Sequence, residues 1–181
     1  LTFKLTVYDN DMNEASDEID IFVVEQIPIG DIQYSDEIGS GADDCYPSIL
    51  ENERVMVHGI VTAVSPRSYK NFYVQDLNAD EWGGIYVYDN TLSPEEGDEL
   101  IFGAKVEEFY GFTELREVVS PSILSSGLTI NPTQIAVADL GIQCSEDGEM
   151  YEGMLVQLSD VVIDSVEQFT TAINWFIIEE S

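Results

Sequence analysis

A short run of cations and aromatic rings is the first place where this chain could bind a ligand. The residues are Arg67, Tyr69, Lys70, Phe72 and Tyr73. Proteins that hold single-stranded nucleic acid combine these side chains, because cations meet phosphates and flat rings stack on bases. The other interpretation is a solvated loop followed by a strand that places Phe72 or Tyr73 in the core.

The charge of the chain argues against nucleic acid as that ligand. The sequence contains 36 acidic and 6 basic residues, and its formal net charge at pH 7 is -30. Affinity for nucleic acid comes largely from phosphate neutralisation, and two cations do not offset a field of this sign. We therefore expect neither nucleic acid nor a membrane as a partner. The acidic surface is typical of a secreted or cell-surface protein in an extracellular medium.

Two acidic loops offer oxygen ligands of the kind that calcium prefers. Neither has the glycine and the final glutamate of an EF-hand loop. Calcium binding is one interpretation, and ordinary turns in which Asp and Asn cap their own backbone are the other. The first loop contains Asp9, Asp11, Asn13 and Asp17, and the second contains Asp76, Asn78 and Asp80.

The sequence has two cysteines, Cys45 and Cys144. An even pair with no other thiol favours an intramolecular disulfide. Such a bridge would close a loop of about 100 residues and would contribute at most about 4.7 kcal/mol to stability in the chain-entropy model.

Residues suited to catalysis are scarce. His58 is the single histidine, and with both cysteines expected to be bridged it cannot build a zinc site or a His-dependent nucleophile. We therefore expect that the chain is not an enzyme. Five aromatic residues could form a platform for sugar, although we favour places in the core and at its rim: Trp82, Tyr86, Tyr88, Phe109 and Tyr110.

One small β-barrel must position these side chains, and residues 53–115 predict it. Apolar residues alternate at a period of two over residues 55–63, and short apolar strands follow at 72–74 and 85–88. A longer strand at 99–109 contains Gly103, where we expect a bulge or a barrel corner. Closing such a sheet leaves no exposed edge.

Two more strands precede the barrel, at residues 1–8 and 19–24, joined by the polar loop DNDMNEASDE. Their pattern resembles the last two strands of an immunoglobulin-like (Ig-like) domain of the PKD or cadherin-like kind. A lone hairpin is marginal in water. We therefore expect it to belong to a domain whose earlier strands are absent, or to dock on a neighbouring molecule or on the barrel. On this interpretation the sequence begins inside a domain and carries no signal peptide.

The C-terminal segment repeats the start of the barrel. The runs EGMLVQLSDVVIDSV and NWFIIEE align with ERVMVHGIVTAV and NFYVQD, and the two cysteines lie at the same spacing before the two strands. These residues are either the start of a second repeat or strands that complete the first barrel.

The ordered blocks GIVTAV, NFYVQD, GGIYVYD, GDELIFGAKVEEFYGFTEL and YEGMLVQL resemble the OB-fold module of secreted bacterial multidomain proteins. Such modules occur in large extracellular endonucleases ahead of the catalytic domain, and in surface proteins exported by the type IX route. The resemblance covers about residues 30–180 and implies an OB-type barrel without the catalytic residues of the nuclease. The fold alone does not imply a function.

We therefore predict an all-β chain in four parts. Residues 1–26 form the Ig-like hairpin, 27–50 a linker with a strand at 32–34, 51–143 the OB-type barrel, and 144–181 the second repeat or closing strands. We expect a non-catalytic structural or interaction module that can assemble through its terminal strands. Its partners would be other domains of the same protein or copies of itself. The alternative is an accessory nucleic-acid- or polymer-binding module of an extracellular nuclease or phosphatase.

Overall fold

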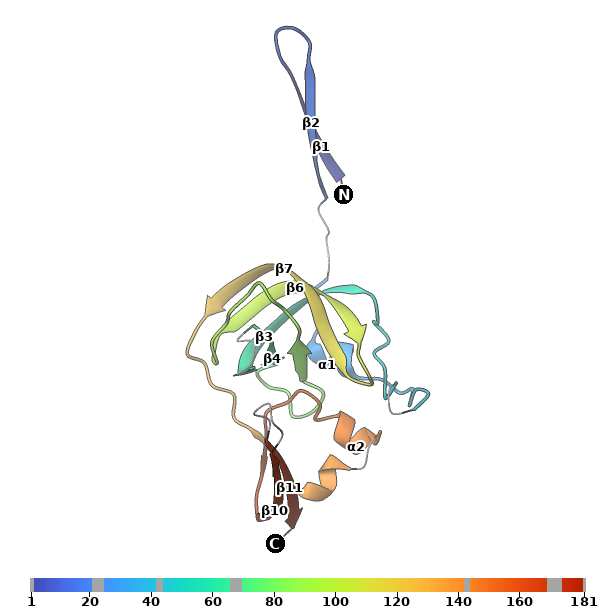
Figure 1. The fold of residues 1–181 in the computed structure, drawn as a ribbon, viewed down its shortest axis with the longest axis vertical. Helices are drawn as coiled ribbons and strands as arrows, with labels where there is room; N and C mark the ends of the chain where they lie inside the picture. The colour runs from blue at the N-terminus through green and yellow to red at the C-terminus, as the bar shows by residue number, and fades with distance from the viewer. Residues whose placement is uncertain are drawn as a thin grey trace.

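The computed structural model describes residues 2–20, 25–41, 44–65, 70–141, 144–168 and 174–180. Strands make up most of its regular structure (Figure 1), which confirms the predicted all-β class. The helices are α1 (Ile29–Gln33), the 3-10 helix η1 (Val137–Leu140) and α2 (Glu146–Glu149). The strands are β1 (Thr2–Tyr8), β2 (Glu14–Asp20), β3 (Arg54–Val64), β4 (Phe72–Gln75), β5 (Gly84–Val87), β6 (Glu99–Glu108), β7 (Thr113–Ser125), β8 (Thr133–Ile135), β9 (Val156–Leu158), β10 (Val161–Gln168) and β11 (Asn174–Glu180).

The central domain is a closed five-stranded barrel with the order β3-β4-β5-β7-β6. Its closure depends on two pairings between strands that are not consecutive. β3 pairs antiparallel with β6, and β5 pairs in parallel with the start of β7. This arrangement is an OB-type barrel, as the sequence predicts.

Alternation along each strand fills the barrel with apolar side chains. The residues that point inward are almost fully buried, and Phe72 and Phe102 pack edge to face with ring centroids 6.3 Å apart. The bulge predicted at Gly103 is confirmed, because the β6–β7 register shifts on both sides of it. A Cβ atom there would lie 2.9 Å from Val119 Cγ2, so glycine lets β7 cross β6 closely.

The strand predicted at residues 32–34 is wrong, because this part of the chain forms α1. Ile29 and Ile32 stand one helical turn apart on the same face, and both are fully buried. They complete the barrel core at one end, where Gly59 of β3 lies beneath Ile29. Burial of two isoleucine side chains outweighs the weak local preference of so short a segment.

The predicted N-terminal hairpin is present and consists of β1 and β2 in antiparallel register. The bounds predicted for its second strand are wrong, because β2 spans Glu14–Asp20 and so includes half of the predicted loop, while residues 21–24 lie outside the described residues. Phe3, Leu5 and Val7 alternate along β1, and each is more than half exposed. Figure 1 shows this hairpin projecting from the barrel. Of the arrangements expected from the sequence, docking on the chain's own barrel is therefore not observed.

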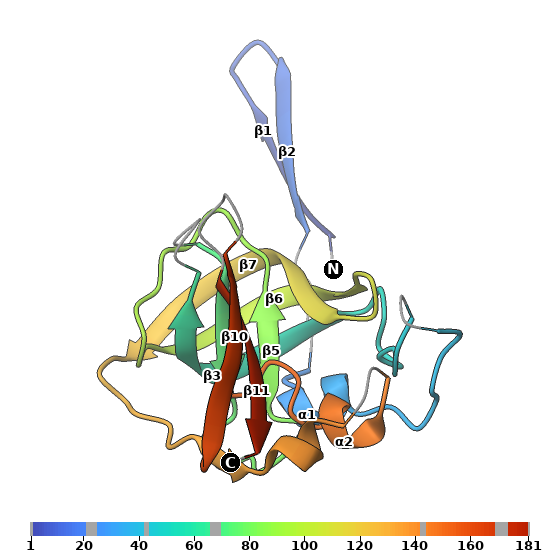
Figure 2. The same ribbon diagram turned by 60° about the horizontal axis from the view of Figure 1, so that its bottom comes forward.

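The C-terminal segment forms two small sheets outside the barrel. β8 pairs in parallel with β9, and β10 pairs antiparallel with β11. Figure 2 shows the β10–β11 hairpin and α2 in front of the barrel. The barrel is closed by the β3–β6 and β5–β7 pairs. The C-terminal strands therefore do not complete it. A second OB-like repeat stays a prediction.

Candidate functional site

The outward face of β4 and β5 is the best candidate for a binding surface. Alternation puts Phe72 and Val74 of β4 in the core, so the neighbouring Tyr73 and Gln75 point the other way. On β5, Tyr86 points outward by the same reasoning. In OB-type barrels the second and third strands commonly form the face that contacts ligand.

Aromatic rings line one half of this face. The rings of Tyr73 and Tyr86 lie with centroids 5.0 Å apart, and those of Tyr86 and Phe112 lie 5.7 Å apart. Phe109 and Tyr110, in the turn between β6 and β7, continue the group and are 51% and 73% exposed. We call Tyr73, Tyr86, Tyr88, Phe109, Tyr110 and Phe112 the aromatic surface.

Arg116 holds part of the aromatic surface in place. Its guanidinium lies 4.5 Å from the ring centroid of Tyr88 and 5.2 Å from that of Phe109. The same group forms salt bridges with Glu107 and Glu114. Burial raises the pKa of the Glu114 carboxyl, and the contact with Arg116 opposes this shift. The arginine charge is therefore balanced within the protein, which disfavours a role in binding phosphate.

A cavity of about 360 Å³ adjoins this arginine. Its polar lining comes from Asp89, Asn90, Thr91, Glu107, Arg116 and Glu117. It therefore combines one aromatic ring, that of Tyr88, with several hydrogen-bonding groups. Such a mixture suits a polar, uncharged ligand.

The structure divides the predicted group of cations and aromatic rings. Phe72 is fully buried in the core, so its assignment as a ligand-binding residue is wrong. Tyr73 lies on the outward face, and Lys70 donates a hydrogen bond to the carbonyl of Asn90. The predicted ligand residues Arg67 and Tyr69 lie outside the described residues.

The other half of the β4–β5 face is covered by the chain itself, through residues 145–155, which we call the cover segment. The backbone N–H of Leu155 donates to Gln75 Oε1 at 2.8 Å, and the N–H of Trp82 donates to the Met150 carbonyl at 2.6 Å. Gly84 and Gly153 meet backbone to backbone, and a Cβ atom on Gly84 would lie 2.4 Å from the Gly153 carbonyl carbon. No side chain fits between them.

The cover segment brings Glu149 and Glu152 close to Glu108 of the barrel, and we call these three residues the carboxyl cluster. Glu152 Oε1 accepts a hydrogen bond from the backbone N–H of Thr113 at 3.3 Å. Glu108 Oε1 accepts from the hydroxyl of Thr113 at 2.7 Å and from the backbone N–H of Ser48 at 2.8 Å. Glu108 Oε2 is buried without a hydrogen-bond partner among the described residues.

Burial and mutual repulsion change the acidity of the carboxyl cluster. Burial, followed by the charge of Glu149, raises the pKa of Glu152 to about 8. Burial and the charge of Glu108 raise the pKa of Glu149 to about 6, and burial also raises the pKa of Glu108. The cluster therefore retains a proton near neutral pH.

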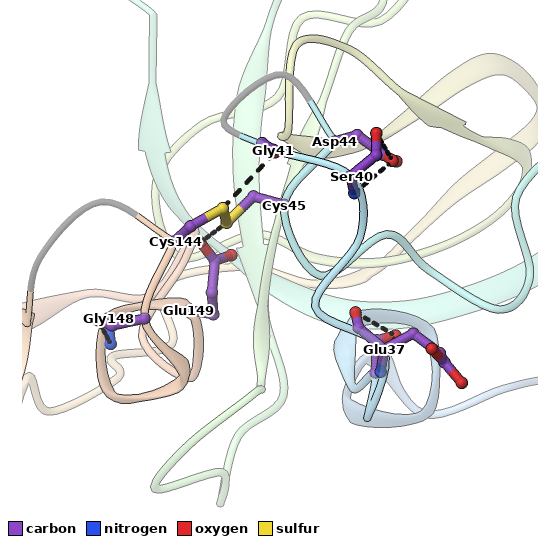
Figure 3. Close-up of a disulfide and its surroundings, with 10 residues drawn as sticks. Glu37, Ser40, Gly41, Asp44, Cys45, Cys144, Gly148 and Glu149 are labelled. Atoms are coloured by element: carbon purple, nitrogen blue, oxygen red, sulfur yellow. Dashed lines mark hydrogen bonds between the residues drawn. A yellow bond between two sulfur atoms is a disulfide. The ribbon is translucent and has the colours of Figure 1, made fainter.

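The predicted disulfide is confirmed. Cys45, in the loop before β3, is bonded to Cys144, and their Cα atoms are 5.4 Å apart. Figure 3 shows Glu149 directed at the disulfide, with a carboxyl oxygen 3.1 Å from the Sγ of Cys45. Because Cys144 directly precedes the cover segment, the disulfide ties the start of that segment to the loop before β3.

The first predicted calcium loop is organised as a turn. Asp9 Oδ1 accepts hydrogen bonds from the backbone N–H groups of Asp11 and Asn13 at 2.8 and 2.9 Å. The pKa of Asp9 is lowered first by a side-chain hydrogen bond from Asn13 and then by these backbone bonds. Asp17 lies along β2 opposite Leu5, away from the loop tip. The four predicted ligands are therefore not gathered around one point.

The second predicted calcium loop connects β4 to β5. Asp76 Oδ2 accepts a hydrogen bond from the backbone N–H of Ile29 at 3.1 Å, so it caps the start of α1. Asn78 and Asp80 line a cavity formed with residues 129–134. Across the described ranges, no group of three or more His, Cys, Asp and Glu side chains is arranged to hold a metal ion. The donor set does not fit calcium as placed, and calcium binding stays a prediction.

The contact found for the His58 side chain among the described residues is an ion pair with Glu99. Its Nε2 atom lies 2.9 Å from Glu99 Oε1 across the β3–β6 pair. Glu99 also accepts a hydrogen bond from the hydroxyl of Ser125 at 2.6 Å, so this carboxylate is held between two strands. Its pKa is lowered by the bonds from Ser125 and His58.

Sequence reasoning missed the carboxyl cluster and the role of Arg116. Glu108, Glu149 and Glu152 are three of many acids in the chain, and only the docking of the cover segment brings them together. Alternation along β5 does place Tyr86 outward, so part of the aromatic surface was accessible to sequence reasoning.

Comparisons with known proteins add no assignment. No family model matches the chain, and no curated protein matches it. None of the helices in the described part of the chain has the length and hydropathy of a membrane span. The OB-type barrel is confirmed. The resemblance to modules of secreted bacterial proteins stays a prediction.

Proposed function

We propose that this chain is a non-catalytic structural and interaction module of a secreted or cell-surface bacterial protein. The observation that supports this most is the β1–β2 hairpin. One of its faces carries Phe3, Leu5 and Val7, which are exposed. The opposite face carries polar groups such as the Lys4–Glu18 ion pair, with its charged atoms 3.6 Å apart. An isolated hairpin with one apolar face is marginally stable, and a second sheet packed on that face would bury it.

The partner that best fits this face is the apolar sheet of an adjoining β-domain in the same protein. A second copy of the chain is disfavoured, because each copy has a formal net charge of -30 and like charges repel over the Debye length. The resemblance of the hairpin to the final strands of an Ig-like domain points to the same partner. Assembly through terminal strands would then be a property of the longer protein.

Hydrogen exchange and sedimentation of this chain test the proposal. In dilute solution we expect a monomer in which the amides of residues 2–20 exchange much faster than those of β3 and β6. Full protection of these amides in the monomer would overturn the proposal. If the chain instead forms a dimer in which these amides are protected, the partner of the hairpin is a second copy and not an adjoining domain. In a longer protein, Leu5→Asp should abolish the protection, and Thr6→Asp on the opposite face should preserve it.

A second candidate function is the binding of a polymer by the aromatic surface. The half-exposed rings of Tyr88 and Phe109 can stack on flat groups, and the nearby cavity supplies hydrogen-bonding side chains. The charge of the chain and the paired state of Arg116 disfavour a polyanion. The ligand proposed is therefore a neutral polysaccharide rather than nucleic acid.

Affinity electrophoresis in gels that contain neutral polysaccharides tests this second candidate. Retention should be lost in the Phe109→Ala variant and preserved in Tyr8→Ala, which removes an exposed tyrosine from the hairpin. Equal retention of both variants would contradict the assignment. Binding of oligo-dT at 50 mM salt, roughly the concentration at which phosphate contacts are strong, would instead restore nucleic acid as the ligand.

A further inference from the structure

The cover segment brings two carboxyl groups against a third on the barrel. Glu149 and Glu152 face Glu108, and each of the three pKa values is raised first by burial. Ionisation of all three would place three like charges in a partly buried contact. Such an arrangement is unfavourable unless a counter-charge is present.

Among the described residues, the groups that surround the carboxyl cluster supply no positive charge. Glu152 receives hydrogen bonds from the backbone N–H of Thr113 and the side chain of Gln33 in α1. On β4, Tyr73 is a neutral neighbour whose pKa is raised above its ordinary value by burial and by Glu152. The carboxylates of Asp44 and Glu51, from the loop before β3, add negative charge near Glu108.

No salt bridge reaches the cluster within the part of the chain that the structure describes. The ion pairs found there join Lys4, Arg54, His58, Lys105 and Arg116 to other carboxylates. Because no described cation offsets these charges, we expect a bound proton to reduce the repulsion among Glu108, Glu149 and Glu152.

We propose that residues 145–155 act as a pH-sensitive cover of the β4–β5 face, which stays docked while the carboxyl cluster holds a proton and lifts when the cluster is fully ionised. Lifting would expose Gln75, Gly84 and Trp82, which the cover segment now contacts. This inference goes beyond both proposed functions and depends on neither.

The direction of the pH effect follows from proton binding. When the cover segment lifts, the pKa values of Glu149 and Glu152 return to the ordinary glutamate value near 4.5. When it is docked, the pKa is about 8 for Glu152 and about 6 for Glu149. The docked state therefore binds more protons. Docking is strongest below pH 4.5 and weakens as the pH rises to about 8. Each unit of pKa difference changes the docking equilibrium by about tenfold.

The two ends of the cover segment remain fixed during this movement. The disulfide between Cys45 and Cys144 holds its start, and the pairing of β9 with β8 holds the chain just after its end. The movement is therefore the lifting of a tethered loop. The close backbone contact between Gly84 and Gly153 would open with it.

Amide hydrogen exchange between pH 5 and 8.5 tests the proposal when rates are corrected for the intrinsic effect of pH. The reporters are the N–H groups of Trp82 and Leu155, which donate across the contact. Their protection in the unmodified chain should fall by about tenfold or more over this range. The amides of Val57 and Phe102 in the barrel should remain protected and thus report on folding.

Two matched variants identify the group responsible. Glu152→Gln keeps the shape of the side chain without its charge, so most of the pH dependence should disappear. Glu146→Gln changes an exposed residue of α2 and should keep the original pH profile. The proposal is overturned if Trp82 and Leu155 show constant corrected protection in the unmodified chain. It is also overturned if Glu152→Gln, with its barrel amides still protected, retains the original profile.

Discussion

Helix α1 closes one end of the barrel with two isoleucines, and shortening either should destabilise the fold. Ile29 and Ile32 are both fully buried and belong to the same core as the barrel strands. Removal of most of a buried isoleucine side chain costs about 2–5 kcal/mol, the sum of lost transfer free energy and of the cavity left behind. We expect this cost for Ile29→Ala and for Ile32→Ala, a large fraction of the roughly 5–15 kcal/mol that stabilises a typical domain.

Equilibrium denaturation in urea measures this cost directly. The midpoint should fall in both variants while the slope m stays constant, because the area exposed on unfolding hardly changes. Ile49→Ala provides the matched control, since Ile49 is 71% exposed. Its free energy of unfolding should change by less than about 0.5 kcal/mol.

A particular result would refute this account of α1. If Ile32→Ala were no more destabilising than Ile49→Ala, the helix would not be part of the core in solution. The barrel would then have to close its end in another way. The double variant of Ile29 and Ile32 should be less destabilised than the sum of the single variants, because neighbouring residues share the cavity that forms.

Three further predictions concern the contacts around the β4–β5 face. Replacing Cys45 and Cys144 by serine opens a loop with a sequence separation of 99 and should lower the free energy of unfolding by up to about 4.7 kcal/mol, measured in urea. Asp76→Ala should cost about 0.5–2 kcal/mol through loss of the α1 cap, equally with and without millimolar calcium. A larger cost with calcium present would support a metal ligand. Gly84→Ala should displace Gly153, lower stability by about 1–3 kcal/mol and speed amide exchange in the cover segment.

Matched variants control for general effects of these changes. Asp80→Ala alters the same loop as Asp76→Ala and should leave stability nearly unchanged, since Asp80 is exposed. Gly30→Ala is the control for Gly84→Ala, because a Cβ atom on Gly30 would come no nearer than 3.7 Å to another residue. That substitution should be neutral or stabilising, as for alanine in a helix. A similar loss in Gly30→Ala would contradict the explanation by steric contact.

The sequence by itself determined the barrel and the alternation along its first strand. Alternation at a period of two separates Val55 and Val57 from their neighbours on β3. On β4 the sequence left open whether Phe72 or Tyr73 enters the core, and the structure places Phe72 there. The bulge at Gly103 and the disulfide were also predictable. These features depend on local periodicity, on glycine geometry or on the small number of cysteines.

Only the tertiary structure decided what lies against that barrel. The strand expected at residues 32–34 became α1 because the open barrel end offers burial to two isoleucines. The carboxyl cluster joins Glu108 to residues about 40 positions later in the chain, and no local pattern distinguishes them from the other acids. Contacts between distant segments depend on which surfaces the fold leaves uncovered. The hydrophobic periodicity of a sequence predicts local strands and helices, and it does not predict these contacts.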